Sequence, residues 1–249
     1  MLRSIKSMKG FKIRAKDGNI GEAVDFLFDD ERWIIRYLVA DTKSLLPGKR
    51  VLISPAAFYG TPKWEDKEFP VILTREMVKQ CPNVDTAKPV SRKKETELAR
   101  YYNWPLYWSQ WPGTSAPPVF TPKEGPLGEM IPAEEGEGSH LRSAKEVSTY
   151  HIHAQDGKIG RVEDIICDDE AWNICYAVVN TRNWLPGRRV LISPYWIKGV
   201  SWAESEIEVD LSREQIKRSP VYDKKASVNR KYEEALYDYY GRQKYWKEE

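Results

Sequence analysis

The chain has 249 residues, of which 41% are hydrophobic, and this size and composition suit two domains with apolar cores. Its 39 basic and 37 acidic side chains give a net charge of +2, a balance that argues against a dedicated nucleic-acid-binding protein. No run approaches the roughly 18 apolar residues of a membrane span, and no signal peptide is evident, so we expect a cytoplasmic protein without an integral membrane segment.

One sequence unit occurs twice. Residues 17–55 align without a gap on residues 156–194, and about 22 of roughly 39 positions are identical, far above chance for so short a span. What both copies keep is expected to serve the structure or the function of the shared unit. We predict one domain at residues 1–108 and another at 140–249, joined by a proline- and glycine-rich linker at 109–139.

The clearest strand is predicted at residues 33–39 and again at 172–178. Every second residue of this strand is identical in the two copies, whereas the residues between them change. The kept residues are Trp33, Ile35, Tyr37 and Val39, with Trp172, Ile174, Tyr176 and Val178. A face that is constant at a period of two is typical of a strand packed on a core.

The longest helix is predicted at about residues 92–102 and 230–240. Both copies place a good N-cap before this helix and, after it, a residue type that readily adopts the left-handed conformation. These flanking residues are Ser91 and Asn103, with Asn229 and Gly241. The capping residues differ between the copies but have the same capping ability. Each copy therefore predicts the helix independently.

Neither a kept cysteine nor a kept Ser-His-Asp or Cys-His arrangement occurs in the two copies. We therefore predict no disulfide framework, no metal site, no cofactor and no catalytic residue. The pair His151 and His153 could face one side of a strand as metal ligands. The first copy has Lys12 and Arg14 there, which favours a solvated polar face.

Two groups of carboxylates are kept. The acidic triplets Asp29-Asp30-Glu31 and Asp168-Asp169-Glu170 could attract a cation, or their aspartates could support a tight turn between strands. Asp25 and Asp164 lie among apolar residues in both copies. They are candidates either for a functional carboxylate with an altered pKa or for a structural hydrogen bond.

Two sets of side chains are candidates for binding. A basic pair occurs in each copy, Lys49-Arg50 and Arg188-Arg189, and forms either a weak phosphate-binding patch or a solvated turn. An aromatic segment, called here the aromatic tail, begins at the end of the long helix in each copy, continues beyond it and is the stronger candidate. Its residues are Tyr101, Tyr102, Trp104, Tyr107 and Trp108, with Tyr239, Tyr240, Tyr245 and Trp246. The tails are expected to pack on their own domain, on the other domain or on a partner.

Several motifs together resemble the PRC-barrel family. They are Asp-Gly-x-Ile-Gly, the acidic triplet, the aromatic strand, Leu-Pro-Gly-(Lys/Arg)-Arg-Val-Leu-Ile-Ser-Pro and Leu-(Thr/Ser)-Arg-Glu, each present twice in register. This family includes the cytoplasmic domain of the photosynthetic reaction centre H subunit and the C-terminal domain of the ribosome maturation factor RimM. The resemblance implies small all-β barrels that dock other macromolecules, with no catalytic residue to carry over.

We therefore expect a mainly β chain with two PRC-barrel-like small barrels in tandem, each followed by short C-terminal helices. The expected function is that of a non-enzymatic adaptor that docks protein partners, with the two copies paired as an intramolecular pseudo-dimer and homo-oligomers compatible with it. Two alternatives are a factor associated with the ribosome or RNA processing, and an accessory protein of a photosynthetic or membrane complex. Nucleic acid is not an expected partner.

Overall fold

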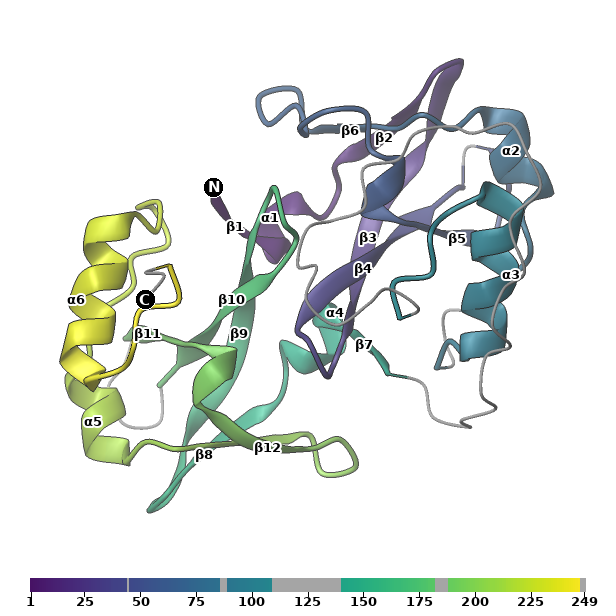
Figure 1. Cartoon of the computed structure of the whole chain (residues 1–249). Helices are drawn as coiled ribbons and strands as arrows, with labels where there is room; N and C mark the ends of the chain where they lie inside the picture. The colour runs from purple at the N-terminus through teal and green to yellow at the C-terminus, as the bar shows by residue number, and fades with distance from the viewer. Residues whose placement is uncertain (44, 86–88, 109–139, 182–187, 247–249) are drawn as a thin grey trace. The chain divides into compact units, whose positions relative to one another are not determined.

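A computed structural model describes residues 1–43, 45–85, 89–108, 140–181 and 188–246 of the chain (Figure 1). Residues in strands make up 38% and residues in helices make up 23%, so the fold is mainly β, as the sequence predicts. The predicted linker at 109–139 lies outside the described residues. None of the helices in the described ranges is long and apolar enough to cross a membrane.

The first copy contains six strands and several short helices. Its strands are β1 (Leu2–Ser4), β2 (Lys12–Ala15), β3 (Gly18–Asp29), β4 (Ile34–Asp41), β5 (Arg50–Ile53) and β6 (Glu68–Pro70). Its helices are α1 (Ile5–Met8), α2 (Arg75–Gln80) and α3 (Arg92–Tyr102), with a 3-10 turn, η1, at Pro55–Ala57.

The second copy repeats this order with one additional strand. Its strands are β7 (Leu141–Ser143), β8 (His151–Ala154), β9 (Gly157–Asp168), β10 (Ile174–Asn180), β11 (Arg189–Ile192), β12 (Ile197–Ser201) and β13 (Glu206–Val209). Its helices are α4 (Ala144–Val147), α5 (Arg213–Arg218) and α6 (Arg230–Tyr240), with a 3-10 turn, η2, at Pro194–Trp196.

The strands form two sheets of related topology. One has the order β5-β4-β3-β2-β6, and the other has the order β11-β10-β9-β8-β13-β12. Most neighbours are antiparallel, but β2 pairs with β6 and β8 with β13 in parallel. Within the described ranges neither sheet closes into a barrel, so the structure shows two related sheets and not the closed barrels that were expected.

Each sheet gains one strand from the other copy of the repeat. β7 pairs with the end of β3, and β1 pairs with the end of β9, both antiparallel. β3 and β9 are long strands. Their first halves pair with β2 and β8, and their last residues pair with β7 and β1. β1 and β7 are called here the exchanged strands, since each completes the sheet of the copy to which it does not belong in sequence.

The chain accordingly divides into two compact units that do not follow the repeat boundaries at these segments. The N unit comprises residues Met8–Ser143 and Glu170–Trp172, and the C unit comprises Met1–Ser7, Ala144–Asp169 and Asn173–Glu249. In the N unit α2 contacts β3, and in the C unit α5 contacts β9.

The predicted core strands are confirmed for six of the eight kept residues, whereas the other two lie just before the strands begin. Ile35, Tyr37 and Val39 are buried in β4, as are their counterparts in β10. Trp33 and Trp172 instead lie in the preceding turns with φ of 56° and 61°. This left-handed backbone is uncommon for a bulky side chain. Trp172 is still buried, whereas Trp33 is only half-buried.

Capping explains why the two long helices are predicted correctly. Ser91 and Asn229 accept hydrogen bonds from the N–H groups of the first turn of α3 and α6. Asn103 and Gly241 follow with φ of 57° and 61°. The helices span the predicted residues because all of these signals are local.

A glycine is required where two strands approach closely. A Cβ added to Gly21 would lie 2.0 Å from the carbonyl oxygen of Asp41, and one added to Gly160 would lie 2.3 Å from that of Asn180. Both copies keep this glycine of the Asp-Gly-x-Ile-Gly motif because any side chain would clash with the backbone of the neighbouring strand.

Candidate functional site

The kept aspartates Asp25 and Asp164 each accept a hydrogen bond from the serine of an exchanged strand. Ser143 Oγ donates to Asp25 Oδ2 at 2.5 Å in the N unit, and Ser4 Oγ donates to Asp164 Oδ2 at 2.5 Å in the C unit. Asp164 also accepts from the backbone N–H of Lys6 at 3.1 Å. These contacts favour the structural interpretation of both carboxylates, because each one anchors a strand that is only three residues long.

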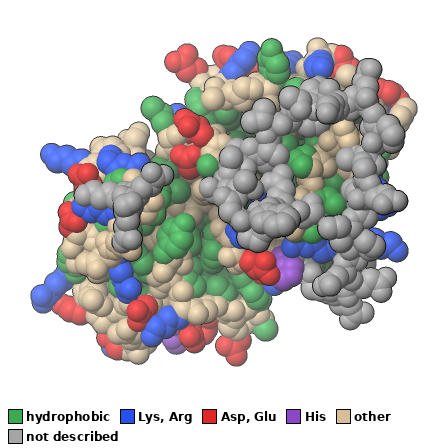
Figure 2. All heavy atoms as spheres, in the orientation of Figure 1, with side chains coloured by type: hydrophobic (Ala, Val, Ile, Leu, Met, Phe, Trp, Pro, Cys, Tyr) green, Lys and Arg blue, Asp and Glu red, His purple; other side chains and the backbone are tan. Residues whose placement is uncertain are grey.

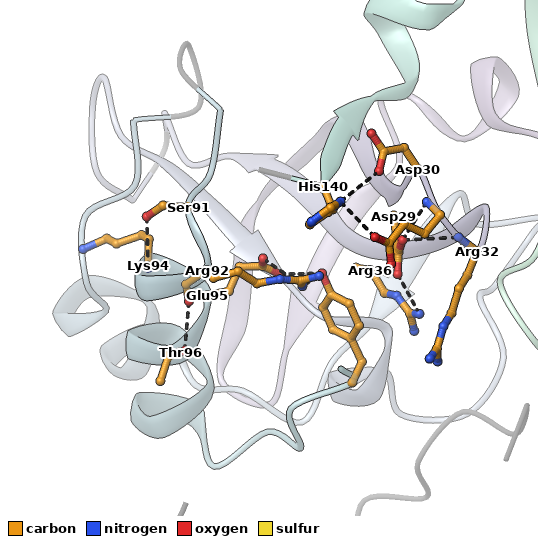
Figure 3. A network of polar contacts seen from close by, with 12 residues as sticks. Asp29, Asp30, Arg32, Arg36, Ser91, Arg92, Lys94, Glu95, Thr96 and His140 are labelled. Carbon is orange, nitrogen blue, oxygen red and sulfur yellow. Dashed lines mark hydrogen bonds and ion pairs between the residues drawn. The ribbon is translucent and has the colours of Figure 1, made fainter. Parts of the chain in front are cut away.

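The acidic triplets bind the arginine of the same strands. Arg142 Nε lies 2.7 Å from Asp30 Oδ2, and Arg3 Nε lies 3.1 Å from Asp169 Oδ2. His140 Nδ1 lies 3.4 Å from Asp30 Oδ1 (Figure 3). A buried carboxylate is costly unless it is paired, so these arginines stabilise the turn as well as the strand.

Asp29 closes the turn in the N unit. Its side chain is buried, and Oδ1 accepts from the backbone N–H groups of Glu31 at 3.0 Å and Arg32 at 3.3 Å. Arg36 lies 3.1 Å from its other oxygen (Figure 3). These contacts favour the turn interpretation over a cation site. Among the described residues, no group of three or more His, Cys, Asp or Glu side chains is arranged to hold a metal ion.

A buried glutamate on the long helix organises the aromatic tail of the N unit. Glu95 is fully buried, and Oε2 accepts from the hydroxyl of Tyr107 at 2.8 Å. Arg92, one helical turn earlier, lies 3.3 Å from Glu95 Oε1 and donates to the same hydroxyl at 2.5 Å (Figure 3). The Arg92 guanidinium lies over the ring of Trp108, 4.5 Å from its centroid, and Arg36 lies over Tyr107 at 4.0 Å. The tail is therefore fixed on its own unit through polar and cation–π contacts.

Burial raises the pKa of Glu95 to about 7. Hydrogen bonds from Tyr107 and Tyr37 and the charge of Arg92 lower this pKa, whereas the negative charge of Asp29 raises it further. Desolvation outweighs the favourable contacts because the side chain is entirely excluded from water. Glu95 is thus a carboxyl group that titrates near neutrality inside the fold.

The C unit contains the same arrangement around Glu233. This buried side chain accepts at Oε1 from the hydroxyls of Tyr176 and Tyr245, both at 2.8 Å, and Arg230 lies 3.0 Å from Oε2. Arg230 also lies over the ring of Trp246 at 4.2 Å from its centroid. An Arg, Glu, Tyr and Trp set is therefore repeated in both units.

The inner residues of the tails pack differently in the two units. Trp104 is buried and stacks on Tyr102, with ring centroids 4.3 Å apart. The C unit has Arg242 in place of Trp104, and Trp196 of η2 packs on Tyr240 there, at 4.7 Å. The same surface of the long helix is thus covered by a tryptophan that comes from a different part of the chain.

The first tyrosine of each tail connects its long helix to the preceding short helix. The hydroxyl of Tyr101 donates to the carbonyl of Met77 on α2 at 2.8 Å, and that of Tyr239 donates to the carbonyl of Gln215 on α5 at 2.9 Å. Both rings are more than a third exposed. They combine a structural hydrogen bond with an accessible aromatic face.

The basic pairs are largely engaged in the fold. Lys49 Nζ donates to the carbonyl of Cys81 at 2.9 Å, just past the end of α2, and Arg188 donates to the carbonyl of Ser219 at 2.5 Å, just past α5. Cations suit these positions because helix C-termini carry unpaired carbonyls. Arg189 lies 2.8 Å from Glu163, whereas Arg50 is exposed.

Over the face drawn in Figure 2, the basic and acidic side chains that are described are interspersed. No gathering of cations of the kind that attracts a polyanion is seen among the described side chains on this face. The basic pairs are better explained by the carbonyls and carboxylates that they contact.

Several residues of these clusters are not evident from the motifs considered first. The clearest are the Leu-Arg-Ser segments at 2–4 and 141–143, and the Arg-Lys-x-Glu segments at 92–95 and 230–233. Both are kept by the two copies, so a comparison extended beyond residues 17–55 would have found them. Comparison of the chain with protein-family models and with curated proteins found no match.

Proposed function

We propose that this protein is a non-enzymatic adaptor built from two PRC-barrel-like modules, each of which docks a macromolecular partner. The main support is the use of the kept ionisable residues inside each unit. Asp25 and Asp164 anchor strands, while Glu95 and Glu233 anchor tails. The features that the copies share therefore build the module, and the remaining surface is free to differ for recognition.

Each unit presents a strongly exposed tyrosine at the same connection. Tyr59, two residues after η1, is 73% exposed, and Tyr195, within η2, is 77% exposed. These residues are not aligned in sequence, yet both belong to the segment that follows the strand Val-Leu-Ile. Tyrosine is enriched at protein interfaces because it combines a large apolar face with a polar hydroxyl. We propose these two tyrosines as the docking positions of the adaptor.

A capture experiment with full-length protein tests this proposal. We expect Tyr59→Ala combined with Tyr195→Ala to reduce capture of a native partner at least about tenfold, since removing a central interface tyrosine costs more than about 1 kcal/mol. Tyr101→Ala combined with Tyr239→Ala is the comparison variant, because it removes two exposed tyrosines of the tails, and a loss of capture by this variant alone would favour the tails as the docking surface. Equal capture by the wild type and the first double variant would reject the docking positions. Chemical conversion of the captured partner by this protein would reject the adaptor function.

Pairing of the two copies as an intramolecular pseudo-dimer is part of the same proposal. Its support is the reciprocal exchange of β1 and β7, because each copy supplies a strand to the sheet of the other. A protease site inserted within residues 109–139 tests it. We expect the two halves to remain associated after cleavage, as judged by their co-elution, and separation of intact halves would contradict it.

A further inference from the structure

The two exchanged strands are equivalent in sequence and in register. Both consist of Leu-Arg-Ser, and residues 2–4 oppose 168–166 while residues 141–143 oppose 29–27. Residues 141–143 follow residues 2–4 by 139 positions, and residues 166–168 follow residues 27–29 by the same number. Every residue of one pairing therefore has its counterpart in the other. We call the receiving sheet edge, with its two aspartates, the strand site.

The two strand sites also present equivalent side chains. Each has an aspartate for the serine, 2.5 Å from its hydroxyl, and an aspartate for the arginine, at 2.7 Å in the N unit and 3.1 Å in the C unit. The serine and arginine therefore meet the same chemistry in both units. A strand of this sequence fits either site, whichever part of whichever chain supplies it.

We propose that the strand sites also accept the Leu-Arg-Ser strand of a second copy of this chain, so that the protein forms dimers by intermolecular exchange. In such a dimer each site is filled with the same contacts that fill it within one chain. Exchange of an identical element between protomers is a low-cost route to dimers for this reason.

The balance between the two states depends on concentration. Within one chain the donor strand is covalently linked to its site, and such a link gives effective concentrations on the order of millimolar. The monomer is therefore favoured in dilute solution, and the exchanged dimer is favoured when strands find their sites at high protein concentration. A pairing of only three residues opens more readily than the core strands do, which gives the route for exchange.

Reversal of one ion pair provides a specific test in the full-length protein. Arg142→Glu places two like charges at the N-unit strand site, and Asp30→Lys in a separate chain does the same with the opposite sign. In either variant alone, β7 and the N-unit strand site no longer match in charge, whereas β1 and the C-unit site are unchanged. In a mixture, the strand of each variant matches the site of the other in charge. We expect mixing to yield at least about tenfold more 1:1 heterodimer than dimer of either variant alone, by size-exclusion chromatography with light scattering.

The double variant Arg142→Glu with Asp30→Lys is the control, because the reversed pair is then restored within one chain. We expect it to be monomeric in dilute solution, like the wild type. If both single variants are folded by circular dichroism and their mixture contains no heterodimer, the proposal is wrong.

A second experiment decides the matter if the single variants fail to fold. Wild-type chains with two different C-terminal tags are mixed in urea and refolded at concentrations from micromolar to about millimolar, the range in which tethered and free strands compete. We expect doubly tagged dimer to increase with concentration. Absence of doubly tagged dimer at the highest concentration would overturn the proposal.

Discussion

In the N unit, Trp172 packs among three phenylalanines, Phe26, Phe58 and Phe69, with ring centroids 5.2–6.4 Å away. The corresponding positions of the C unit hold isoleucines, at 165, 197 and 207. Trp33, the counterpart of Trp172, stacks on Phe28 and is only half-buried. The polar contacts of the exchanged strands are nearly identical in the two units, whereas the apolar filling is not. Hydrogen bonds and ion pairs depend on particular atoms, while an apolar space can be filled in several ways.

The surroundings of the two buried glutamates differ as well. Near Glu95, Arg36 forms an ion pair with the buried Asp29 and covers the ring of Tyr107. The C unit has a buried cysteine, Cys175, where the N unit has Arg36. The N unit thus places more charge beside its glutamate than the C unit does.

The largest expected difference between the units concerns the two turn tryptophans. Trp172→Ala should lower the free energy of unfolding by about 3–5 kcal/mol, because a large buried ring leaves a cavity among the three phenylalanines. Trp33→Ala should cost about 1–2 kcal/mol, since its ring is already half in water. Urea denaturation followed by circular dichroism measures both. Equal losses would show that the two turns are packed alike.

Glu95 gives the second prediction. Its pKa in the fold, about 7, is above the ordinary value of 4.5, so folding favours the protonated form. Its contribution is therefore most favourable below about pH 4.5 and is lost as the pH rises to about 7, at a cost of up to about 3 kcal/mol. Glu95→Gln should remove this loss. We expect the stability of the variant relative to the wild type to increase from pH 5 to pH 7, and a constant difference would contradict it.

The tail tyrosines should behave alike in the two units. Tyr107→Phe removes a donor to Glu95 and an acceptor for Arg92, and should cost about 2 kcal/mol because the hydrogen bonds involve charged groups. Tyr245→Phe should cost about as much, since in each unit a second tyrosine, Tyr37 or Tyr176, still bonds to the glutamate. Thermal denaturation of both variants measures the two losses. Strongly unequal losses would show that the second tyrosine compensates in one unit only.

The smallest effect should be the same in both units. Ser4→Ala and Ser143→Ala each remove one hydrogen bond to an aspartate and should each cost about 1 kcal/mol. Because the two serines anchor different strands, their effects should add within about 0.5 kcal/mol in the double variant. Hydrogen exchange of the amides in β3 and β9 measures each site separately. Strongly unequal losses would contradict the equivalence of the two strand sites.

The repeat, the period of the core strands and the limits of α3 and α6 can all be predicted from the amino-acid sequence. These features depend on neighbours within about one helical turn, as the hydrogen bond from the N–H of Lys94 to Ser91 illustrates. Trp33 and Trp172 were predicted within the strand because their period matched it. The left-handed turn before β4 and β10 is not encoded by a glycine, so nothing local marked it.

Three features depend on contacts between distant residues: the sheet that β1 and β7 complete, the packing of Trp172 and the carboxylate that the tail tyrosines bind. Each of these contacts joins residues that are distant in sequence, such as Ser4 and Asp164 or Ser143 and Asp25. Strand pairing is specified by register, and the same Leu-Arg-Ser strand satisfies the register of either sheet. The chain therefore contained the residues of the strand site without indicating which copy would fill it.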